Sequence, residues 1–246
     1  MCTFITAVAP GGQPGLFVVF NRDEMLDRPS APPELMRREG MRILAPRDLE
    51  AGGSWLGLNE RGVFAALTNR FGLTSMDHHR SRGLVVFDAL QFDGAAEAVQ
   101  MLREMDPGRH NGFHLLVADE EDGFVVWNDT QRLRSKRLDS GIHVFTERSF
   151  GAGESRRLTE LQQRADKLEG WTDETVAKLV GWMRQHCEGE PLESTCVHLP
   201  QRNYGTRSST IVQLGPKRRF AHAEGPPCQT EYGEYDELLE RLLRRP

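Results

Sequence analysis

Short runs of β-branched and aromatic residues recur along the chain, and glycine, proline or charged residues separate them. The first two runs, residues 3–8 and 16–20, are joined by a segment rich in glycine and proline, which is typical of an antiparallel hairpin. A later pair, residues 55–58 and 63–67, surrounds a turn in which Gly62 suits a left-handed backbone position. The same pattern predicts further strands at residues 113–119, 124–129, 141–146, 209–214 and 219–224.

Apolar residues spaced three and four apart predict four helices. The first covers residues 93–105, with Asp93 as a candidate N-cap. The other three lie at residues 158–168, 176–183 and 234–245. By contrast, residues 27–54 are rich in proline, arginine and glycine, and we expect them to form a long irregular connection of the kind that often lines a binding site.

The runs at 16–20 and 124–127 are apolar at successive positions rather than at alternate ones. This is typical of strands that are covered on both faces. Hairpins and groups of helices follow one another along the chain, so we predict an α+β fold in which two antiparallel sheets stack and helices cover their outer faces. A chain of 246 residues can bury such a core, and we expect a single domain spanning residues 1–246.

Charge and hydropathy narrow the range of partners. The net charge of −5 disfavours general binding to nucleic acids or to anionic membrane surfaces. No apolar run is long enough to cross a bilayer, and no basic-then-apolar secretory leader precedes the first strand. These features predict a cytoplasmic protein without a transmembrane segment.

The chain contains four cysteines, which are Cys2, Cys187, Cys196 and Cys228. No two of them have the close spacing of a disulfide-rich scaffold or of a tetrahedral zinc site. His186 precedes Cys187, and His198 follows Cys196 after one residue, but this spacing matches no common metal motif. We therefore predict neither a bound metal nor another resident cofactor.

Cys2 directly follows the first methionine. If an aminopeptidase removes that methionine, which a small second residue permits, the thiol and a free α-amine belong to one residue. An α-amine with a pKa of about 8 can accept the thiol proton, so an amino-terminal cysteine carries its own base. The alternative is that Cys2 is a small core residue at the start of a strand, because free cysteine is most often structural.

Four polar residues at the end of the second strand bear on this choice. Residues 21–24, Asn-Arg-Asp-Glu, follow the buried run at 16–20, and the hairpin places them beside Cys2. Arg22 could then stabilise a thiolate, and Asp23 or Glu24 could hold the ammonium group. The alternative is a solvent-exposed cluster of salt bridges, which contributes little to stability.

Five sequence blocks occur in an order that resembles a known family. They are MCTF, FNRDE, GGSWLGLNERGVFAALTN, NGFHLLVAD and YGTRSST, and together they extend over roughly residues 2–214. These blocks resemble the NRDE family, whose eukaryotic namesake is the transport and Golgi organisation protein 2. More distantly, they are similar to the cholylglycine hydrolases and penicillin V acylases, which are N-terminal-nucleophile hydrolases. That resemblance implies a four-layer αββα fold with two central antiparallel sheets.

The resemblance to the hydrolases also implies roles for individual residues. Cys2 matches the nucleophile that processing exposes, and Arg22 matches the arginine that steadies its thiol. Asn69 matches an oxyanion-hole position, and Arg207 falls near a second active-site arginine. Hydrogen-bond donors aimed at an oxyanion are typically worth about 3 kcal/mol each in acyl transfer. With Asp23 as the adjacent acid, these residues form the predicted catalytic set.

Two positions depart from the hydrolase pattern. Met25 occupies the place of an aspartate three residues after the arginine, and Glu147 occupies the place of an oxyanion-binding asparagine. An ionised carboxylate only accepts hydrogen bonds, so Glu147 would repel a developing oxyanion. The predicted substrate-binding residues are Asn21, Glu24, Trp55 and Glu147. The indole of Trp55 fits either a pocket wall or the core.

Two functions fit these observations. The first is a cysteine amidohydrolase in which Cys2 attacks the linear, non-peptide C–N bond of a small amide and water releases the acyl group. The second, implied by the NRDE resemblance, is a non-catalytic protein that binds and traffics haem or a lipid such as an acyl-CoA. Glu147 and the displaced acid favour the second function, in which haem would be a cargo rather than a catalytic cofactor.

Overall fold

The computed structural model describes residues 2–13, 15–73, 76 and 79–244. The chain divides into two compact units: unit 1 comprises Met1–Arg28 and Ser140–Tyr235, and unit 2 comprises Pro29–Asp139 and Asp236–Pro246. Each unit contains one seven-stranded sheet, and the strand pairs are antiparallel. Two antiparallel sheets with helices confirm the predicted α+β class.

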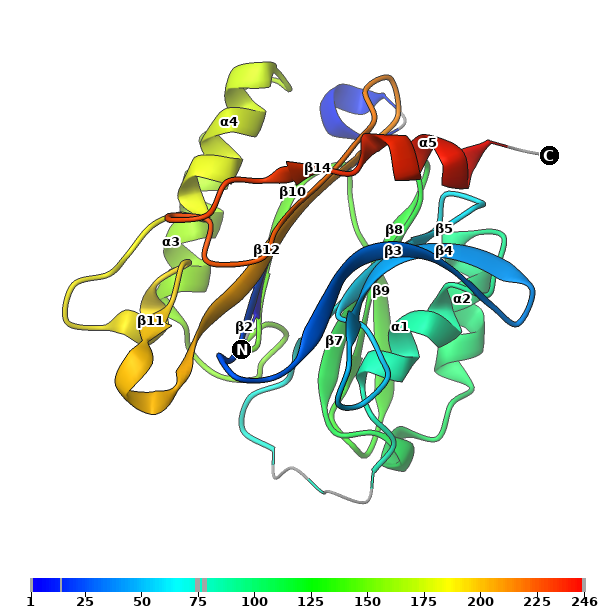
Figure 1. The fold of residues 1–246 in the computed structure, drawn as a ribbon, viewed down its shortest axis with the longest axis horizontal. Coiled ribbons are helices and arrows are strands. Elements are labelled where there is room, and N and C mark those ends of the chain that lie inside the picture. The colour runs from blue at the N-terminus through cyan, green and yellow to red at the C-terminus, as the bar shows by residue number, and fades with distance from the viewer. Residues whose placement is uncertain (1, 14, 74–75, 77–78, 245–246) are drawn as a thin grey trace. The chain divides into compact units, whose positions relative to one another are not determined.

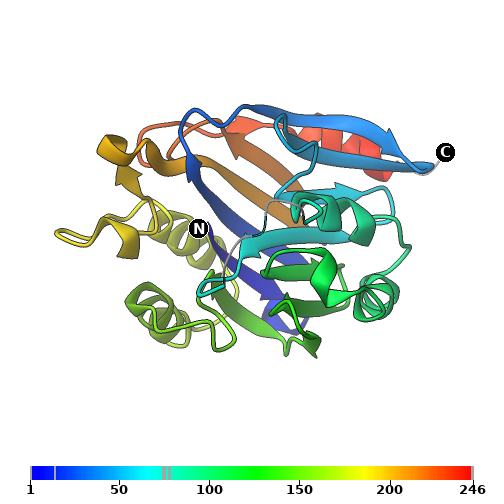
Figure 2. The ribbon, with the colours of Figure 1, turned by 90° about the horizontal axis from the view of Figure 1, so that it is seen from below.

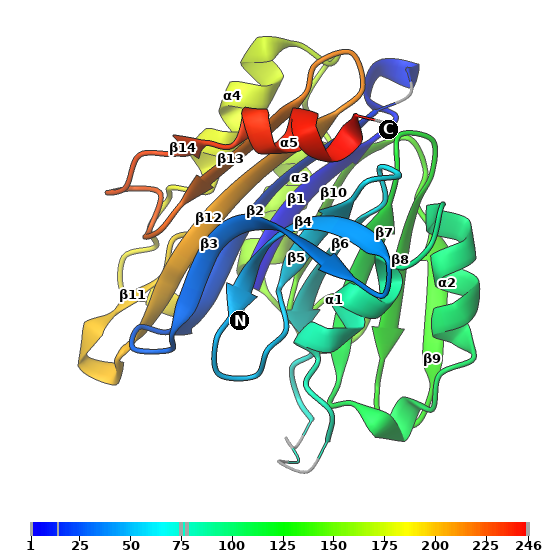
Figure 3. The ribbon, with the colours of Figure 1, turned by 45° about the vertical axis from the view of Figure 1, so that its right-hand side comes forward.

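The sheet of unit 1 has the strand order β10–β1–β2–β12–β13–β14, and β11 also pairs with β12 (Figures 1 and 3). Its strands are β1 (Cys2–Val8), β2 (Leu16–Met25), β10 (Gly141–Thr146), β11 (His198–Leu199), β12 (Tyr204–Leu214), β13 (Arg219–Ala223) and β14 (Gly233–Glu234). Its helices are α3 (Arg156–Ala165) and α4 (Asp173–Trp182), with short 3-10 turns at Pro10–Gly12, Pro191–Glu193 and Pro200–Arg202. The predicted amino-terminal hairpin is confirmed, and it lies between strands from much later in the chain.

The helices of unit 1 pack on one face of its sheet. Ile5, Val19 and Ile211 come from three neighbouring strands, and they share a buried cluster with Leu161 of α3 and Leu179 of α4. Successive side chains of a strand point to opposite faces. Residues at odd positions of β1 and β2 therefore face the helices, and residues at even positions face away from them.

Both helices of unit 1 begin at capping residues. The hydroxyl of Ser155 accepts a hydrogen bond from Leu158 N, and the hydroxyl of Thr172 accepts one from Thr175 N. The two helices predicted here are confirmed, and each begins somewhat earlier than its first regularly spaced apolar residue. In the part of the chain that the structure describes, no helix is long and apolar enough to span a bilayer.

In unit 2 the strand order follows the chain, from β3 to β9. The strands are β3 (Ser30–Arg38), β4 (Met41–Asp48), β5 (Leu56–Asn59), β6 (Phe64–Asn69), β7 (Phe113–Ala118), β8 (Gly123–Asn128) and β9 (Leu133–Arg137). The helices are α1 (Gly83–Ala89), α2 (Ala95–Arg103) and α5 (Asp236–Leu243), with a 3-10 turn at Pro107–Arg109. Val86 of α1 and Val99 of α2 share a buried cluster with Ala65 and Leu115 of the sheet. The carboxyl-terminal helix ends on Arg42, whose guanidinium donates to Leu242 O at 3.1 Å.

The expectation of an irregular connection over residues 27–54 is wrong, because β3 and β4 form a hairpin there. In Figure 2 this hairpin is the pair of lighter blue ribbons along the upper right edge. The prolines at positions 32 and 33 fall where the register shifts, between Ala31 and Glu34, and β3 is an edge strand that tolerates proline. Glu39 and Gly40 make the tight turn with φ values of 49° and 92°.

Two further details of unit 2 differ from the sequence prediction. The short helix α1 was not predicted. The N-cap of α2 is Gly94 rather than Asp93. Gly94 has no side chain to cap the helix, so the carboxylate of Asp119 accepts from Ala95 N at 2.9 Å instead.

Gly53 is required by a close backbone contact in the GGSWLG block. A Cβ atom on Gly53 would lie 2.5 Å from the carbonyl carbon of Gly83, whereas a Cβ atom on Gly181 of α4 would meet nothing within 4 Å. We expect Gly53→Ala to lower the free energy of unfolding by about 1–3 kcal/mol, and Gly181→Ala to raise it by up to about 1 kcal/mol. Urea denaturation of both variants measures this, and equal effects would contradict the contact.

Candidate active site

The first two strands bring Cys2 and Arg22 together. β1 and β2 pair in an antiparallel register that places Cys2 directly opposite Arg22. Residues opposite each other in such a pair project from the same face, with Cβ atoms about 5 Å apart. On the other side of β2, Ser208 of β12 is opposite Arg22. Cys2, Arg22 and Ser208 therefore form a row across three strands, on the face that points away from α3 and α4.

This row is buried. Cys2 is 8% exposed and Arg22 is 4% exposed. Burial, with a smaller contribution from the negative charge of Asp23, raises the pKa of the Cys2 thiol to about 11. The thiol is therefore protonated at neutral pH in the chain that still carries the first methionine. Nucleophilic attack by Cys2 requires a base that removes its proton.

A β-bulge brings Arg207 to the same end of the sheet. The register of β12 against β2 shifts between Thr206 and Ser208, so Arg207 is an extra residue between them. Bulges are common beside active sites because they redirect a side chain. The buried Nε atom of Arg207 has no hydrogen-bond acceptor among the residues that the structure describes. The two arginines of the predicted catalytic set thus lie on neighbouring strands.

Strand alternation places Asn21 and Asp23 on the opposite face from Arg22, toward the helices. The amide nitrogen of Asn21 donates to Met183 O and to Thr195 O, both at 2.8 Å. Both amide protons of Asn21 therefore hold the segments that follow α4. A role of Asn21 in substrate binding stays a prediction.

Asp23 is a buried carboxylate whose polar partners include Thr206 and Arg157. Thr206 Oγ1 donates to its Oδ1 at 2.7 Å, and Arg157 Nη1 lies 3.8 Å from its Oδ2. Burial raises the pKa of the Asp23 carboxyl to about 6, although the positive charge of Arg157 opposes this shift. Asp23 can therefore exchange a proton in mildly acidic solution.

Arg157 connects Asp23 to Glu147. Its Nη2 lies 2.8 Å from Glu147 Oε2, and its Nη1 donates to Ser194 O at 2.8 Å. The side chains of these three charged residues are at most 4% exposed. A buried cation between two carboxylates compensates charge that would otherwise be very unfavourable in the interior. Arg157 thus holds α3, β2 and the end of β10 together.

These contacts change the interpretation of Glu147. The sequence suggested a carboxylate that would repel a developing oxyanion. In the structure Glu147 Oε2 pairs with Arg157, and its Oε1 lies 3.5 Å from Arg148 Nε. Two arginines therefore compensate its charge. Contact between Glu147 and a substrate stays a prediction.

Sequence reasoning missed Arg157. On α3 the buried residues are Arg157, Leu161 and Ala165, at intervals of four. An arginine in the apolar stripe of a helix must have partners in the interior, because an unpaired buried charge is strongly unfavourable. The position of Arg157 in this stripe was the sequence signal that could have identified it as a buried charge.

Glu24 lies on the same face of β2 as Arg22. Its Oε2 is 3.9 Å from Arg22 Nη2, and its side chain is 28% exposed, against 5% for Arg22. Met25, which stands where the hydrolases have an acid, is 41% exposed at the end of the strand. Glu24 is therefore the acidic group of this segment that solvent reaches most easily.

Asn69 and Trp55 belong to unit 2. Asn69 ends β6 and is half-buried, and Trp55 immediately precedes β5 and is 5% exposed. The two segments are adjacent within this unit, because Leu67 N donates to Trp55 O at 2.8 Å. Their approach to Cys2, which belongs to unit 1, stays a prediction.

Comparison with known sequences links the chain to one group of proteins. The sequence model of the family described as Transport and Golgi organisation 2 matches residues 1–225. The human Transport and Golgi organization protein 2 homolog is 35% identical over 226 residues, which cover 80% of this chain and 81% of the human protein. The mouse homolog is 34% identical over 109 residues, which cover 42% of this chain and 38% of the mouse protein.

Solved structures share the fold. The Caenorhabditis elegans ortholog of N-acylethanolamine-hydrolyzing acid amidase has a TM-score of 0.58 at 15% identity, and the match covers 86% of this chain and 92% of that one. Penicillin V acylase from Agrobacterium tumefaciens has a TM-score of 0.56 at 14% identity, covering 96% and 87%. A variant of the conjugated bile acid hydrolase from Clostridium perfringens gives 0.53 at 10% identity, covering 96% and 93%. At these identities the similarity shows the fold alone, and the predicted fold, like that of the N-terminal-nucleophile hydrolases, is confirmed.

The stabilising role of Arg157 can be tested by substitution. Arg157→Met leaves Asp23 and Glu147 buried without this cation, and we expect the free energy of unfolding to fall by about 3–5 kcal/mol at pH 7. The matched control is Arg156→Met, because Arg156 is half exposed in its ion pair with Glu160. Its replacement should change stability by less than about 1 kcal/mol. Urea denaturation measures both, and similar losses in the two variants would contradict the role of Arg157.

The raised pKa of Asp23 makes stability depend on pH. Its pKa is raised from 3.8 to about 6, so between these values the folded state binds more protons than the unfolded state. The stability of the wild type therefore falls as the pH rises through this window. Relative to Asp23→Asn, we expect the wild type to lose about 2 kcal/mol between pH 4 and pH 7. Urea denaturation across this range measures the difference, and a pH-independent difference would contradict the assigned shift.

Proposed function

Since the chain belongs to the Transport and Golgi organisation 2 family and has the N-terminal-nucleophile hydrolase fold, we propose that it is a cysteine amidohydrolase that cleaves a small linear amide through Cys2. The observation that carries this proposal is the register of β1 and β2, which holds a buried thiol opposite a buried arginine. A purely structural cysteine would not need a charged residue as its cross-strand neighbour.

The chemistry begins when loss of the first methionine frees the α-amine of Cys2. This amine accepts the thiol proton, and Sγ attacks the carbonyl carbon of the amide. The resulting ammonium returns the proton to the leaving nitrogen as the C–N bond breaks, and an amine departs. Water then attacks the thioester and transfers its proton to the α-amine. The carboxylic acid leaves as the Sγ–C bond breaks, and the proton returns to Sγ.

In this mechanism Arg22 stabilises the thiolate. A guanidinium group directly across the strand pair lowers the free energy of a thiolate that burial alone would disfavour. Arg207, with its buried Nε donor, is a candidate to bind the acyl carbonyl or a carboxylate of the substrate. Asn69 of unit 2 is the proposed further donor to the oxyanion.

Asp23 and Arg157 support these residues from the helix-facing side of the sheet. Asp23 is next to Arg22 on β2, and its carboxylate is fixed by Thr206 and Arg157. A negative charge close to the amino end of β1 favours the ammonium form of the α-amine, which is needed when the leaving nitrogen takes up its proton. Arg157 is thus a positioning residue, which acts through Asp23 rather than on the substrate.

The proposed substrate class is an N-acyl amide. One structural neighbour is named as an amidase that hydrolyses N-acylethanolamines, and another as a penicillin acylase. Apolar acyl chains would suit a site on a sheet rich in phenylalanine, such as Phe4 and Phe20, whose rings stack at 5.5 Å beside the row of Cys2 and Arg22.

Turnover and intact mass test the proposal together. We expect the purified protein to lack the first methionine and to hydrolyse at least one member of a panel of N-acyl amino acids, N-acylethanolamines and penicillin V. Cys2→Ala should lower kcat by at least about 10³-fold, because the covalent route is lost. Cys187→Ser removes a different thiol and should retain activity.

The outcomes separate the enzyme from a carrier. A retained first methionine, or equal background rates in wild type and Cys2→Ala over the whole panel, would reject the hydrolase. A carrier of haem or of an acyl lipid should instead show saturable binding of haem or acyl-CoA without turnover.

A further inference from the structure

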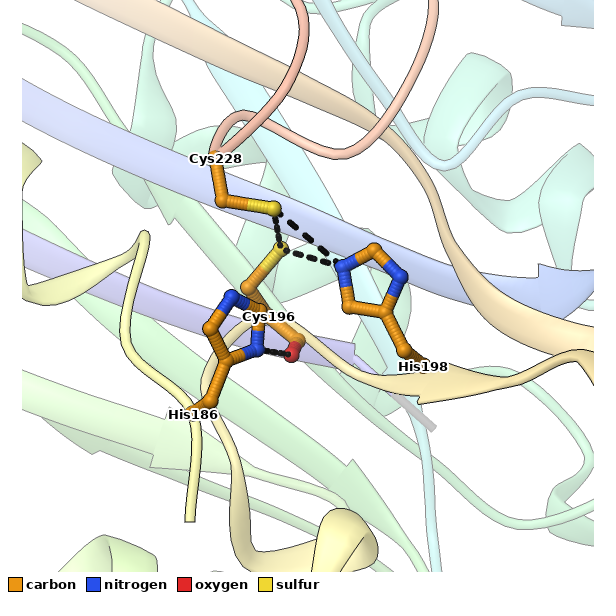
Figure 4. Close-up of side chains that lie close together, drawn as sticks. All are labelled: His186, Cys196, His198 and Cys228. Atoms are coloured by element: carbon orange, nitrogen blue, oxygen red, sulfur yellow. Dashed lines mark hydrogen bonds between the residues drawn. The ribbon is translucent and has the colours of Figure 1, made fainter. Parts of the chain in front are cut away.

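Four side chains with metal-binding atoms converge in unit 1, apart from the row of Cys2 and Arg22. They are His186, Cys196, His198 and Cys228, and one ligand atom from each lies within 4.8 Å of all the others. His186 follows α4, Cys196 lies two residues before β11, His198 begins β11, and Cys228 lies in the loop between β13 and β14. Figure 4 shows the two sulfur atoms and the ring of His198 pointing toward one another.

Three of these atoms already have the separations of a tetrahedral site. Cys196 Sγ is 3.4 Å from Cys228 Sγ, and His198 Nε2 is 3.6 Å from Cys196 Sγ and 3.2 Å from Cys228 Sγ. Bonds of about 2.3 Å to sulfur and 2.0 Å to nitrogen in a tetrahedron place two sulfur atoms about 3.8 Å apart, and sulfur and nitrogen about 3.5 Å apart. A zinc ion therefore fits among these atoms with small adjustments.

His186 is arranged as the fourth ligand. Its Nδ1 lies 3.0 Å from Cys196 O, to which it can donate its proton. Histidines that bind metals commonly donate their other ring N–H to a carbonyl oxygen, which fixes the tautomer and leaves Nε2 free for the metal. No more than 4.8 Å separates the ligand atom of His186 from those of the other three residues, and His186 is exposed, so a small adjustment of its side chain can bring it to the tetrahedral distance of about 3.5 Å.

We propose that His186, Cys196, His198 and Cys228 bind one Zn²⁺ ion. Two thiolates and two imidazoles form one of the common ligand sets of structural zinc, and four protein ligands leave no open position for catalysis. Thiolate ligands select against magnesium and calcium, which prefer oxygen. On binding, the two thiols release their protons to solvent, and the two thiolates neutralise the charge of the ion. Zinc binding here does not require any reaction at Cys2.

The expectation that the cysteines hold no metal was based on spacing alone. His186 and Cys196 are ten residues apart, and Cys228 follows His198 after a further thirty. Compact zinc motifs place their ligands two to five residues apart because one short loop then supplies them. Here the pairing of β12 with β13 returns the chain to β11, and so brings distant ligands together.

Zinc at this site would fix the segment that supports the candidate active site. Ser194 O and Thr195 O accept from Arg157 and Asn21, respectively. Val197 N, between the two ligands of this segment, donates to Thr206 Oγ1 at 2.8 Å. The ligands Cys196 and His198 therefore flank Val197, which contacts Thr206 of β12, and Cys196 directly follows Thr195, which contacts Asn21 of β2. Loss of the ion should loosen these contacts.

The competing arrangement is a disulfide between Cys196 and Cys228. The two sulfur atoms are 3.4 Å apart, well beyond the S–S bond length of about 2.05 Å, and both cysteines are free thiols in the structure. A disulfide also gives no role to the two histidines. The intact mass of the denatured, metal-free chain distinguishes the two, because a disulfide leaves it two hydrogen atoms lighter, whereas thiolates released from zinc take up their protons again.

Metal analysis of the full-length protein tests the site. The protein is purified in the presence of a phosphine reductant, treated with EDTA, incubated with Zn²⁺ and desalted. We expect elemental mass spectrometry to find about one zinc ion per wild-type chain. In Cys228→Ser we expect fewer than about 0.1 zinc ions per chain. The matched control is Cys187→Ser, which removes the neighbouring thiol outside the cluster and should retain the wild-type zinc content.

Measurements on the wild type keep the test decisive if Cys228→Ser does not fold. Co²⁺ titration of the EDTA-treated wild type should produce the visible bands of tetrahedral cobalt and a thiolate-to-cobalt charge-transfer band, saturating at one ion per chain. His186 is exposed, so its substitution should not prevent folding. The variant His186→Asn should weaken Zn²⁺ binding by about 10-fold or more. Zinc below about 0.1 per reconstituted chain, or an intact mass lower by two hydrogens in the reduced preparation, would overturn the proposal.

Discussion

The guanidinium group of Arg157 allows two carboxylates to be buried beneath the sheet of unit 1. Asp23 and Glu147 come from different segments, and each would be strongly destabilising in the interior without a cation beside it. Through Ser194 O the same group also fixes the chain before β11. The positions of β2, the end of β10 and helix α3 therefore depend on one side chain.

Along β2, residues that bind the helix side of the sheet alternate with residues that face the same side as Cys2. Because successive residues of β2 alternate between faces, Asn21 and Asp23 are bound into the helix side, whereas Arg22 faces the same side of the sheet as Cys2. Residues 21–24 thus contribute side chains to both faces of the sheet. The pattern also explains why Asp23 can adjoin Arg22 in sequence and pair with Arg157 instead.

Much of the fold could be predicted from the sequence, because runs of β-branched residues and helical spacing are local signals. The hairpin of β1 and β2 follows from two apolar runs and a glycine-rich turn. The hairpin of β3 and β4 could not be predicted in this way, because its prolines imitate a loop and their effect depends on being at a sheet edge. Of the candidate site, the facing of Cys2 and Arg22 follows from hairpin pairing, but Arg157 is a tertiary feature. The convergence of Cys228 on β11 likewise depends on how β12 pairs with β11 and β13, which the spacing of the ligands does not reveal.

The two sheets differ in how far apart their partners lie along the chain. In unit 2 every strand pairs with its neighbours in sequence, whereas in unit 1 Arg22 of β2 is opposite Ser208 of β12. On the ribosome, the meander of unit 2 can assemble as its strands emerge, but the amino-terminal hairpin can pair with β12 only when nearly the whole chain is made. The sulfur atom at the start of β1 is therefore enclosed late in synthesis, and until then it is open to the enzymes that trim nascent chains.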